Sequence, residues 1–132
     1  MTPYRRLLRI WETDYGRDSG WLIEREGQTI AMLSDARWDD LFWHSYHLEV
    51  VTDDPKLRQR ILNREFWTNA KREGLVWRST EFGEAVEGAY SAGCPFAEPG
   101  RLLMRGLHIA VRSPNSLDRI TLWWRRRTRA HS

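Results

Sequence analysis

The sequence has one cysteine, Cys94, in 132 residues, so an internal disulfide is excluded. A chain without disulfides fits a reducing compartment, and we expect a cytoplasmic protein in which Cys94 is a small apolar residue beside a turn. No apolar run approaches the ~18 residues that a membrane span needs. The N-terminal segment carries basic residues but lacks the apolar stretch of a signal peptide.

Short motifs that carry chemistry are also missing. The chain has neither of the glycine-rich phosphate-binding patterns GxxxxGK[ST] and GxGxxG, and it lacks the nucleophile pattern GxSxG. Paired cysteines for zinc and the signature of an RNA-recognition domain are absent as well. The sequence therefore assigns no catalytic residue, no cofactor and no metal ligand.

Aromatic side chains, in contrast, are plentiful, with eight Trp, four Tyr and four Phe. A domain of this size buries roughly two-thirds of the surface that its unfolded chain exposes, so large rings can build the core. We expect residues 1–132 to form one domain. The expected core residues are Trp11, Trp21, Phe42, Tyr46, Trp77 and Trp124.

Short β-prone runs separated by glycine-containing turns fill the first third of the chain. Residues 4–13, 21–26 and 29–33 have this character, and three such runs in succession predict an antiparallel meander. In the last third, residues 105–111 and 117–124 alternate apolar and polar side chains on either side of the turn SPNS. This alternation predicts a C-terminal hairpin in the same sheet.

Helical signals concentrate in the middle of the chain. Asp54 can cap a helix that begins at Pro55, a break is expected near Asn63, and Gly74 suits the end of the helical segment. The predicted fold class is α+β. We expect a single domain with a twisted antiparallel sheet of about six strands, an N-terminal meander, a C-terminal hairpin, and one or two helices (about 55–73) packed on one face.

The segment DDLFWHSYHLEV contains three side chains of metal-ligand types, Asp40, His44 and His47. In a helix the two histidines would lie side by side, whereas in a strand they point to opposite faces of the sheet. Residues 42–50 alternate between a mostly apolar row and a mostly polar row, which predicts a half-buried strand. We therefore expect no metal site here and a core position for His44.

Basic charge is concentrated at the end of the chain. Residues 101–132 hold eight Arg and one acid, Asp118, for a net charge of +7. Residues 1–100 hold 13 basic and 17 acidic side chains, for a net charge of −4, and the two parts together give the formal +3. The sequence thus predicts a mildly acidic body with a basic end, and residues 126–132 are expected to form a frayed basic tail.

From these features we predict a small soluble intracellular interaction or accessory protein that binds another protein, or a second copy of itself, through an aromatic–arginine surface. The predicted surface consists of Trp43, His47, Arg119, Trp123, Arg125, Arg126 and Arg127. A first alternative is binding of nucleic acid or an anionic surface by the basic segment 119–129, because guanidinium groups pair with phosphates and exposed indoles stack on bases. A second alternative is a small enzyme that uses His44 with Asp40 and Tyr46.

Overall fold

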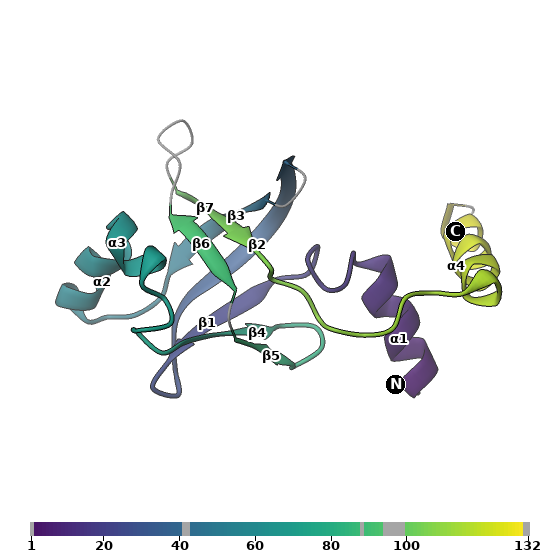
Figure 1. The fold of residues 1–132 in the computed structure, drawn as a ribbon, viewed down its shortest axis with the longest axis horizontal. Helices are drawn as coiled ribbons and strands as arrows, with labels where there is room; N and C mark the ends of the chain where they lie inside the picture. The colour runs from purple at the N-terminus through teal and green to yellow at the C-terminus, as the bar shows by residue number, and fades with distance from the viewer. Residues whose placement is uncertain (1, 41–42, 88, 94–99, 131–132) are drawn as a thin grey trace.

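A curved antiparallel sheet forms the centre of the computed structural model, which describes residues 2–40, 43–87, 89–93 and 100–130 (Figure 1). In chain order the elements are α1 (Pro3–Glu12), β1 (Trp21–Arg25), β2 (Gln28–Asp40), β3 (Trp43–Val50), α2 (Pro55–Ile61), α3 (Arg64–Thr68), β4 (Leu75–Ser79), β5 (Ala85–Val86), β6 (Tyr90–Gly93), β7 (Arg101–Arg105) and α4 (Ser116–Ala130). Among the described residues, seven strands pair in the order β5-β4-β1-β2-β3-β7-β6. The fold class is α+β in one domain, as predicted, and the meander consists of β1, β2 and β3.

The sheet curls so that its two edges approach each other. β5 and β6 are the edge strands, yet only residues 87–89 separate them along the chain. Because so short a connection cannot span a flat seven-stranded sheet, the sheet bends toward a barrel that stays open between its two edges, which are β4 with the two-residue β5 on one side and β6 on the other. We call this opening the seam. The short helix α3 packs against β6, on one side of the seam.

The helices occupy opposite ends of the molecule. α2 and α3 lie at one end of the sheet, whereas α1 and α4 pack together beyond the other end (Figure 1). The two chain termini consequently lie at the same end. Among the described residues, no helix combines the length and apolar character of a membrane span.

The core inside the curved sheet is aromatic, as predicted. Trp21, Tyr46 and Trp77 are at most 1% exposed, and Trp11 is buried on α1. Phe42 lies outside the described residues. The prediction for Trp124 was wrong, because its side chain is 58% exposed on α4.

Residues 4–13 were wrongly predicted as a strand, because they belong to helix α1. The side chain of Thr2 accepts a hydrogen bond from the backbone N–H of Arg5 at 3.3 Å, and Pro3 occupies the first helical position. Both features are start signals of a helix. The adjacent pair Leu7 and Leu8 does not fit strict alternation, which is the pattern that a half-buried strand requires.

The predicted C-terminal hairpin was also wrong in its residues. The last two strands do form an antiparallel pair, but they are β6 and β7. Residues 107–115 form no helix or strand and run from the sheet toward α1. The backbone N–H of Ile109 donates a hydrogen bond to the carbonyl oxygen of Tyr15, just after α1 (2.8 Å). Residues 117–124 and the expected tail up to Ala130 are helical in α4, while residues 131–132 lie outside the described residues.

Most of the other local predictions are confirmed. Residues 43–50 form strand β3. The Asp54 carboxylate accepts a hydrogen bond from the Lys56 backbone N–H (3.0 Å) at the start of α2. The helical segment breaks before α3, whose N-cap residue is Asn63. Its predicted end at Gly74 was wrong, because α3 ends at Thr68 with Asn69 as its C-cap, and residues 69–74 form turns before β4.

Candidate functional site

The inner face of α4 is polar and packs on α1 through the buried carboxylate of Asp118. This carboxylate accepts hydrogen bonds from the Arg112 guanidinium (2.7 Å), the Tyr4 hydroxyl (2.6 Å) and the Asn115 backbone N–H (2.9 Å). The Asn115 side chain in turn accepts from the backbone N–H of Asp118 (2.9 Å). Asn115 and Asp118 thus form a reciprocal cap, which explains why the helix begins here.

These donors lower the pKa of Asp118 to about 2, with Arg112 as the largest contribution, followed by Tyr4 and the Asn115 backbone. All three favour the charged carboxylate over the protonated acid.

A second polar contact joins the middle of α4 to the end of α1. The Glu12 carboxylate pairs with Arg125 at 2.7 Å and with Arg129 at 2.8 Å. The Arg112 guanidinium lies 5.0 Å from the ring centroid of Trp11, and the Trp11 indole N–H donates to the Arg112 carbonyl oxygen (2.9 Å). The helix is therefore held by charged and polar groups along its inner face.

The opposite face of α4 is apolar and exposed. Leu117, Ile120, Trp123 and Trp124 are 75%, 55%, 51% and 58% exposed, respectively. Positions 117, 120 and 124 follow the helical repeat, so these side chains form a stripe along two turns. The two indoles meet edge to face with 5.2 Å between their centroids. An ordinary surface helix has the reverse arrangement, with its apolar stripe toward the core.

Arginines border this stripe. The Arg127 guanidinium lies 5.2 Å from the Trp123 ring centroid, which is a cation–π contact. Arg119 and Arg126 are exposed and have no ion-pair partner among the described residues. We define the outer face of α4 by seven residues: Leu117, Arg119, Ile120, Trp123, Trp124, Arg126 and Arg127.

The structure brings together only part of the surface that the sequence predicted. Arg119, Trp123 and Arg127 lie on the outer face of α4, and the exposed Arg126 lies at its border beside a groove lined by Trp11 and Glu12. Arg125 instead turns inward to Glu12. The half-buried Trp43 and the exposed His47 lie on β3, far from α4 (Figure 1).

Leu117, Ile120 and Trp124 were missed as surface residues. Their spacing of three and four residues, directly after the reciprocal cap of Asn115 and Asp118, is the sequence signal that could have identified them.

The histidine side chains of β3 do not converge. The Nε2 atom of His44 lies 3.5 Å from an Asp14 carboxylate oxygen, and its side chain is 13% exposed, whereas His47 is exposed. The buried Tyr46 donates its hydroxyl to the Arg17 carbonyl oxygen (2.7 Å), and burial raises the pKa of Tyr46. The side chain of Asp40 lies outside the described residues. No cluster of three metal-ligand side chains occurs in the part of the chain that the structure describes.

Acid is expected to loosen α4 before it unfolds the sheet. The pKa of Asp118 is about 2 in the folded protein, against about 3.9 in an unfolded chain. A depressed pKa stabilises the docked helix above about pH 4, and this contribution is lost as the pH falls toward 2. The protection factors of the α4 amides, which correct the hydrogen-exchange rates for the intrinsic rate at each pH, should therefore fall between about pH 4 and 2.

The matched variant is Asp118→Asn, which keeps a capping side chain but cannot be protonated. Its α4 amides should exchange fast already at neutral pH, and the acid dependence should be weaker. Equal acid dependence in both proteins would contradict the assignment to Asp118.

No family model, no curated protein and no solved structure gives a significant match to this chain. Any functional conclusion therefore rests on the geometry of the chain itself.

Proposed function

We propose that the protein is a small non-catalytic interaction module that binds a partner protein through the outer face of α4. The observation that carries this proposal is the exposure of four large apolar side chains on one face of one helix, each at least half exposed. Covering apolar surface gains roughly 25 cal/mol per Å². Exposed apolar patches of this kind mark binding surfaces in soluble proteins.

The chemistry of the outer face favours a protein partner. Trp and Arg are the side chains most enriched among the residues that dominate protein–protein binding energy. Here Trp123 and Trp124 form a contiguous pair, and Arg127 is already packed on Trp123, so little side-chain freedom is lost on binding. The helical stripe matches an apolar groove or a second helix in a partner.

The charge of the outer face specifies the partner further. Arg119, Arg126 and Arg127 bring positive charge to the stripe, and the nearest acid on α4, Asp118, is buried on the inner face. A symmetric pair of α4 helices would bring these arginines close together, which is unfavourable. We infer that the partner presents apolar side chains bordered by carboxylates. The cytoplasmic location remains a prediction from the single cysteine.

A synthetic acidic helix tests this proposal. The probe is a 15-residue peptide with Leu at helical spacing and Glu on both flanks, and its matched control carries Gln for every Glu. We expect the acidic peptide to bind more tightly, with a difference that shrinks at high salt. Trp123→Ala or Trp124→Ala should weaken binding about 30-fold or more, as expected for a central aromatic residue.

Three comparisons make the result decisive. Leu62→Ala removes a side chain that is 71% exposed on the far end of the molecule and should leave binding unchanged. Vesicles with anionic lipid and a single-stranded oligonucleotide test the first alternative, binding through residues 119–129. If either binds more tightly than the peptide and shows the same dependence on Trp123 and Trp124, the partner is not a protein. Peptide binding that survives both Trp substitutions would also refute the proposal.

A further inference from the structure

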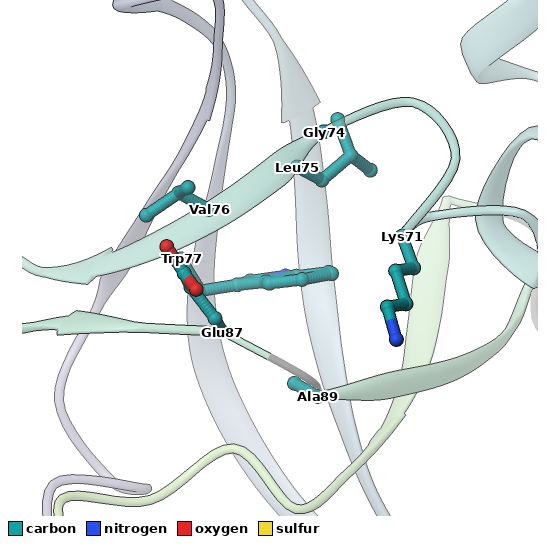
Figure 2. Close-up of a pocket in the computed structure, with 7 residues that line it drawn as sticks. All are labelled: Lys71, Gly74, Leu75, Val76, Trp77, Glu87 and Ala89. Carbon is teal, nitrogen blue, oxygen red and sulfur yellow. The ribbon is translucent and has the colours of Figure 1, made fainter.

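A pocket opens at the seam, at the opposite side of the sheet from α4. Its volume is about 460 Å³, which lies within the range of small-molecule sites. Lining residues come from the turn before β4, from β4 and from the connection between β5 and β6. They are Lys71, Gly74, Leu75, Val76, Trp77, Glu87 and Ala89 (Figure 2).

The middle of the pocket is apolar. Leu75, Trp77 and Ala89 are buried side chains, whereas the half-buried Val76 projects from the other face of β4. The Trp77 indole extends from β4 across the pocket in Figure 2. Its indole N–H is buried and has no hydrogen-bond partner among the described residues. This middle part suits an aliphatic segment of a ligand.

The two ends of the pocket carry opposite charges. Figure 2 shows the Lys71 side chain beyond the tip of the Trp77 indole and the Glu87 carboxylate near its base. Lys71 and Glu87 are exposed, and they do not pair with each other or with any other described residue. An ammonium and a carboxylate are therefore available at opposite ends of one apolar pocket.

The backbone at the Lys71 end of the pocket is fixed by the local fold. Lys71 follows α3, whose Trp67 indole N–H donates to the Ile61 carbonyl oxygen (2.7 Å). The turn after Lys71 is closed by a bond from the Leu75 backbone N–H to the Ala70 carbonyl oxygen (3.0 Å). The backbone at this end of the pocket is thus formed before a ligand arrives, which reduces the entropy cost of binding.

We propose that the seam pocket binds a small zwitterion whose carboxylate and ammonium are separated by an apolar segment, such as an ω-amino acid or a short apolar dipeptide. The ligand carboxylate pairs with Lys71 and its ammonium with Glu87, while the apolar segment lies along the Trp77 indole and Ala89. An α-amino acid does not fit, because both of its charges are attached to one carbon. The site is independent of α4 and goes beyond the proposed function.

Two isomeric probes test this ligand class on the full-length protein. 6-Aminohexanoate carries its charges at opposite ends, whereas 2-aminohexanoate has the same atoms with both charges at one end. We expect 6-aminohexanoate to shift the NMR signals of the Trp77 indole N–H and the Ala89 methyl group, and to bind at least fivefold more tightly than its isomer. Hexanoate and hexylamine, each with one charge, should also bind more weakly.

Charge variants locate the two ends of the ligand. Lys71→Gln and Glu87→Gln should each weaken binding of 6-aminohexanoate about three- to fivefold, as expected for partly exposed ion pairs. Lys56→Gln, at the only other lysine of the chain, should have no effect. The swapped variant Lys71→Glu/Glu87→Lys should restore binding, because the ligand can turn around in the pocket.

Ala89→Leu should abolish binding, because the larger side chain fills the pocket. If the Ala89→Leu protein does not fold, the Lys71 and Glu87 variants still test the proposal. Equal binding of the two isomers would overturn the proposal. So would unchanged affinity in both Gln variants, or the absence of shifts at Trp77 and Ala89 at tens of millimolar probe.

Discussion

Replacing Arg101 by methionine is expected to lower the free energy of unfolding by about 3 kcal/mol, because it removes a buried set of hydrogen bonds. Arg101 lies on β7 and is 7% exposed. Its guanidinium donates to the Ser45 hydroxyl (3.0 Å), the Ser45 carbonyl oxygen (2.8 Å) and the Asp35 carbonyl oxygen (2.6 Å). It also contacts the Asp35 carboxylate at 3.0 Å.

The position of these acceptors explains the size of the effect. Asp35 has a positive φ of 50° at an irregularity in β2, where the register with β3 shifts. Arg101 therefore links β7 to β3 and to the irregular part of β2. Without its donors, the carbonyl oxygen of buried Ser45 loses a partner, and each unsatisfied buried group costs about 1–3 kcal/mol.

Denaturant unfolding of three variants separates hydrogen bonding from charge. Arg101→Lys keeps the charge but loses the planar set of donors, so we expect an intermediate loss. Asp35→Asn removes only the charge of a side chain that is 57% exposed, and it should cost less than about 1 kcal/mol. If Asp35→Asn costs as much as Arg101→Met, the ion pair and not the hydrogen-bond set stabilises this region.

Replacing Trp67 by alanine is expected to cost about 3–5 kcal/mol of unfolding free energy, the usual range for a buried Trp. Trp67 is 1% exposed on α3 and meets the Phe66 ring edge to face at 5.0 Å. Its indole N–H donates to the Ile61 carbonyl oxygen at the end of α2. This single side chain therefore joins α2 to α3 and contributes to the packing of α3 on β6.

Two variants provide the comparison, with stability measured by chemical denaturation. Trp67→Phe keeps most of the apolar volume and loses the hydrogen bond, so a loss of about 1–2 kcal/mol is expected. Leu62→Ala, at a neighbouring residue that is 71% exposed, should change stability by no more than about 0.5 kcal/mol. A loss for Trp67→Ala as small as that for Leu62→Ala would show that α3 contributes little to the folded state.

The elements that the sequence predicted correctly carry their signals locally. β3 alternates in hydrophobicity because one of its faces is buried in the curved sheet. α2 begins at Asp54 and Pro55, two residues whose local conformations favour a helix start. The aromatic core was predictable from Trp21, Tyr46 and Trp77 because large rings are rarely left exposed in such numbers.

The two terminal helices were mispredicted for a common reason. Both helices carry an apolar stripe, which includes Leu8 and Trp11 in α1 and Leu117, Ile120 and Trp124 in α4. Both segments are also short enough that parts of them fit the alternation of a strand, and that pattern was preferred. In α4 most of the apolar residues lie on the outer face, and the alternation of Ile120, Leu122 and Trp124 with Arg119, Thr121 and Trp123 resembled a strand over residues 117–124. The capping residues Thr2 and Asn115 were visible in the sequence and pointed to helices in both places.

By itself, the sequence determined that the protein is an α+β domain with an aromatic core, a meander and a basic C-terminal segment, because periodicity, capping and composition depend on near neighbours in the chain. Only the tertiary structure decided which face of α4 is exposed, since Glu12 pairs with Arg125 across 113 residues. The seam pocket likewise depends on the closure of the sheet, which brings Lys71 and Glu87 to the two ends of the Trp77 indole. Contacts between residues distant in the chain leave no periodic pattern, so both sites had to be found in three dimensions.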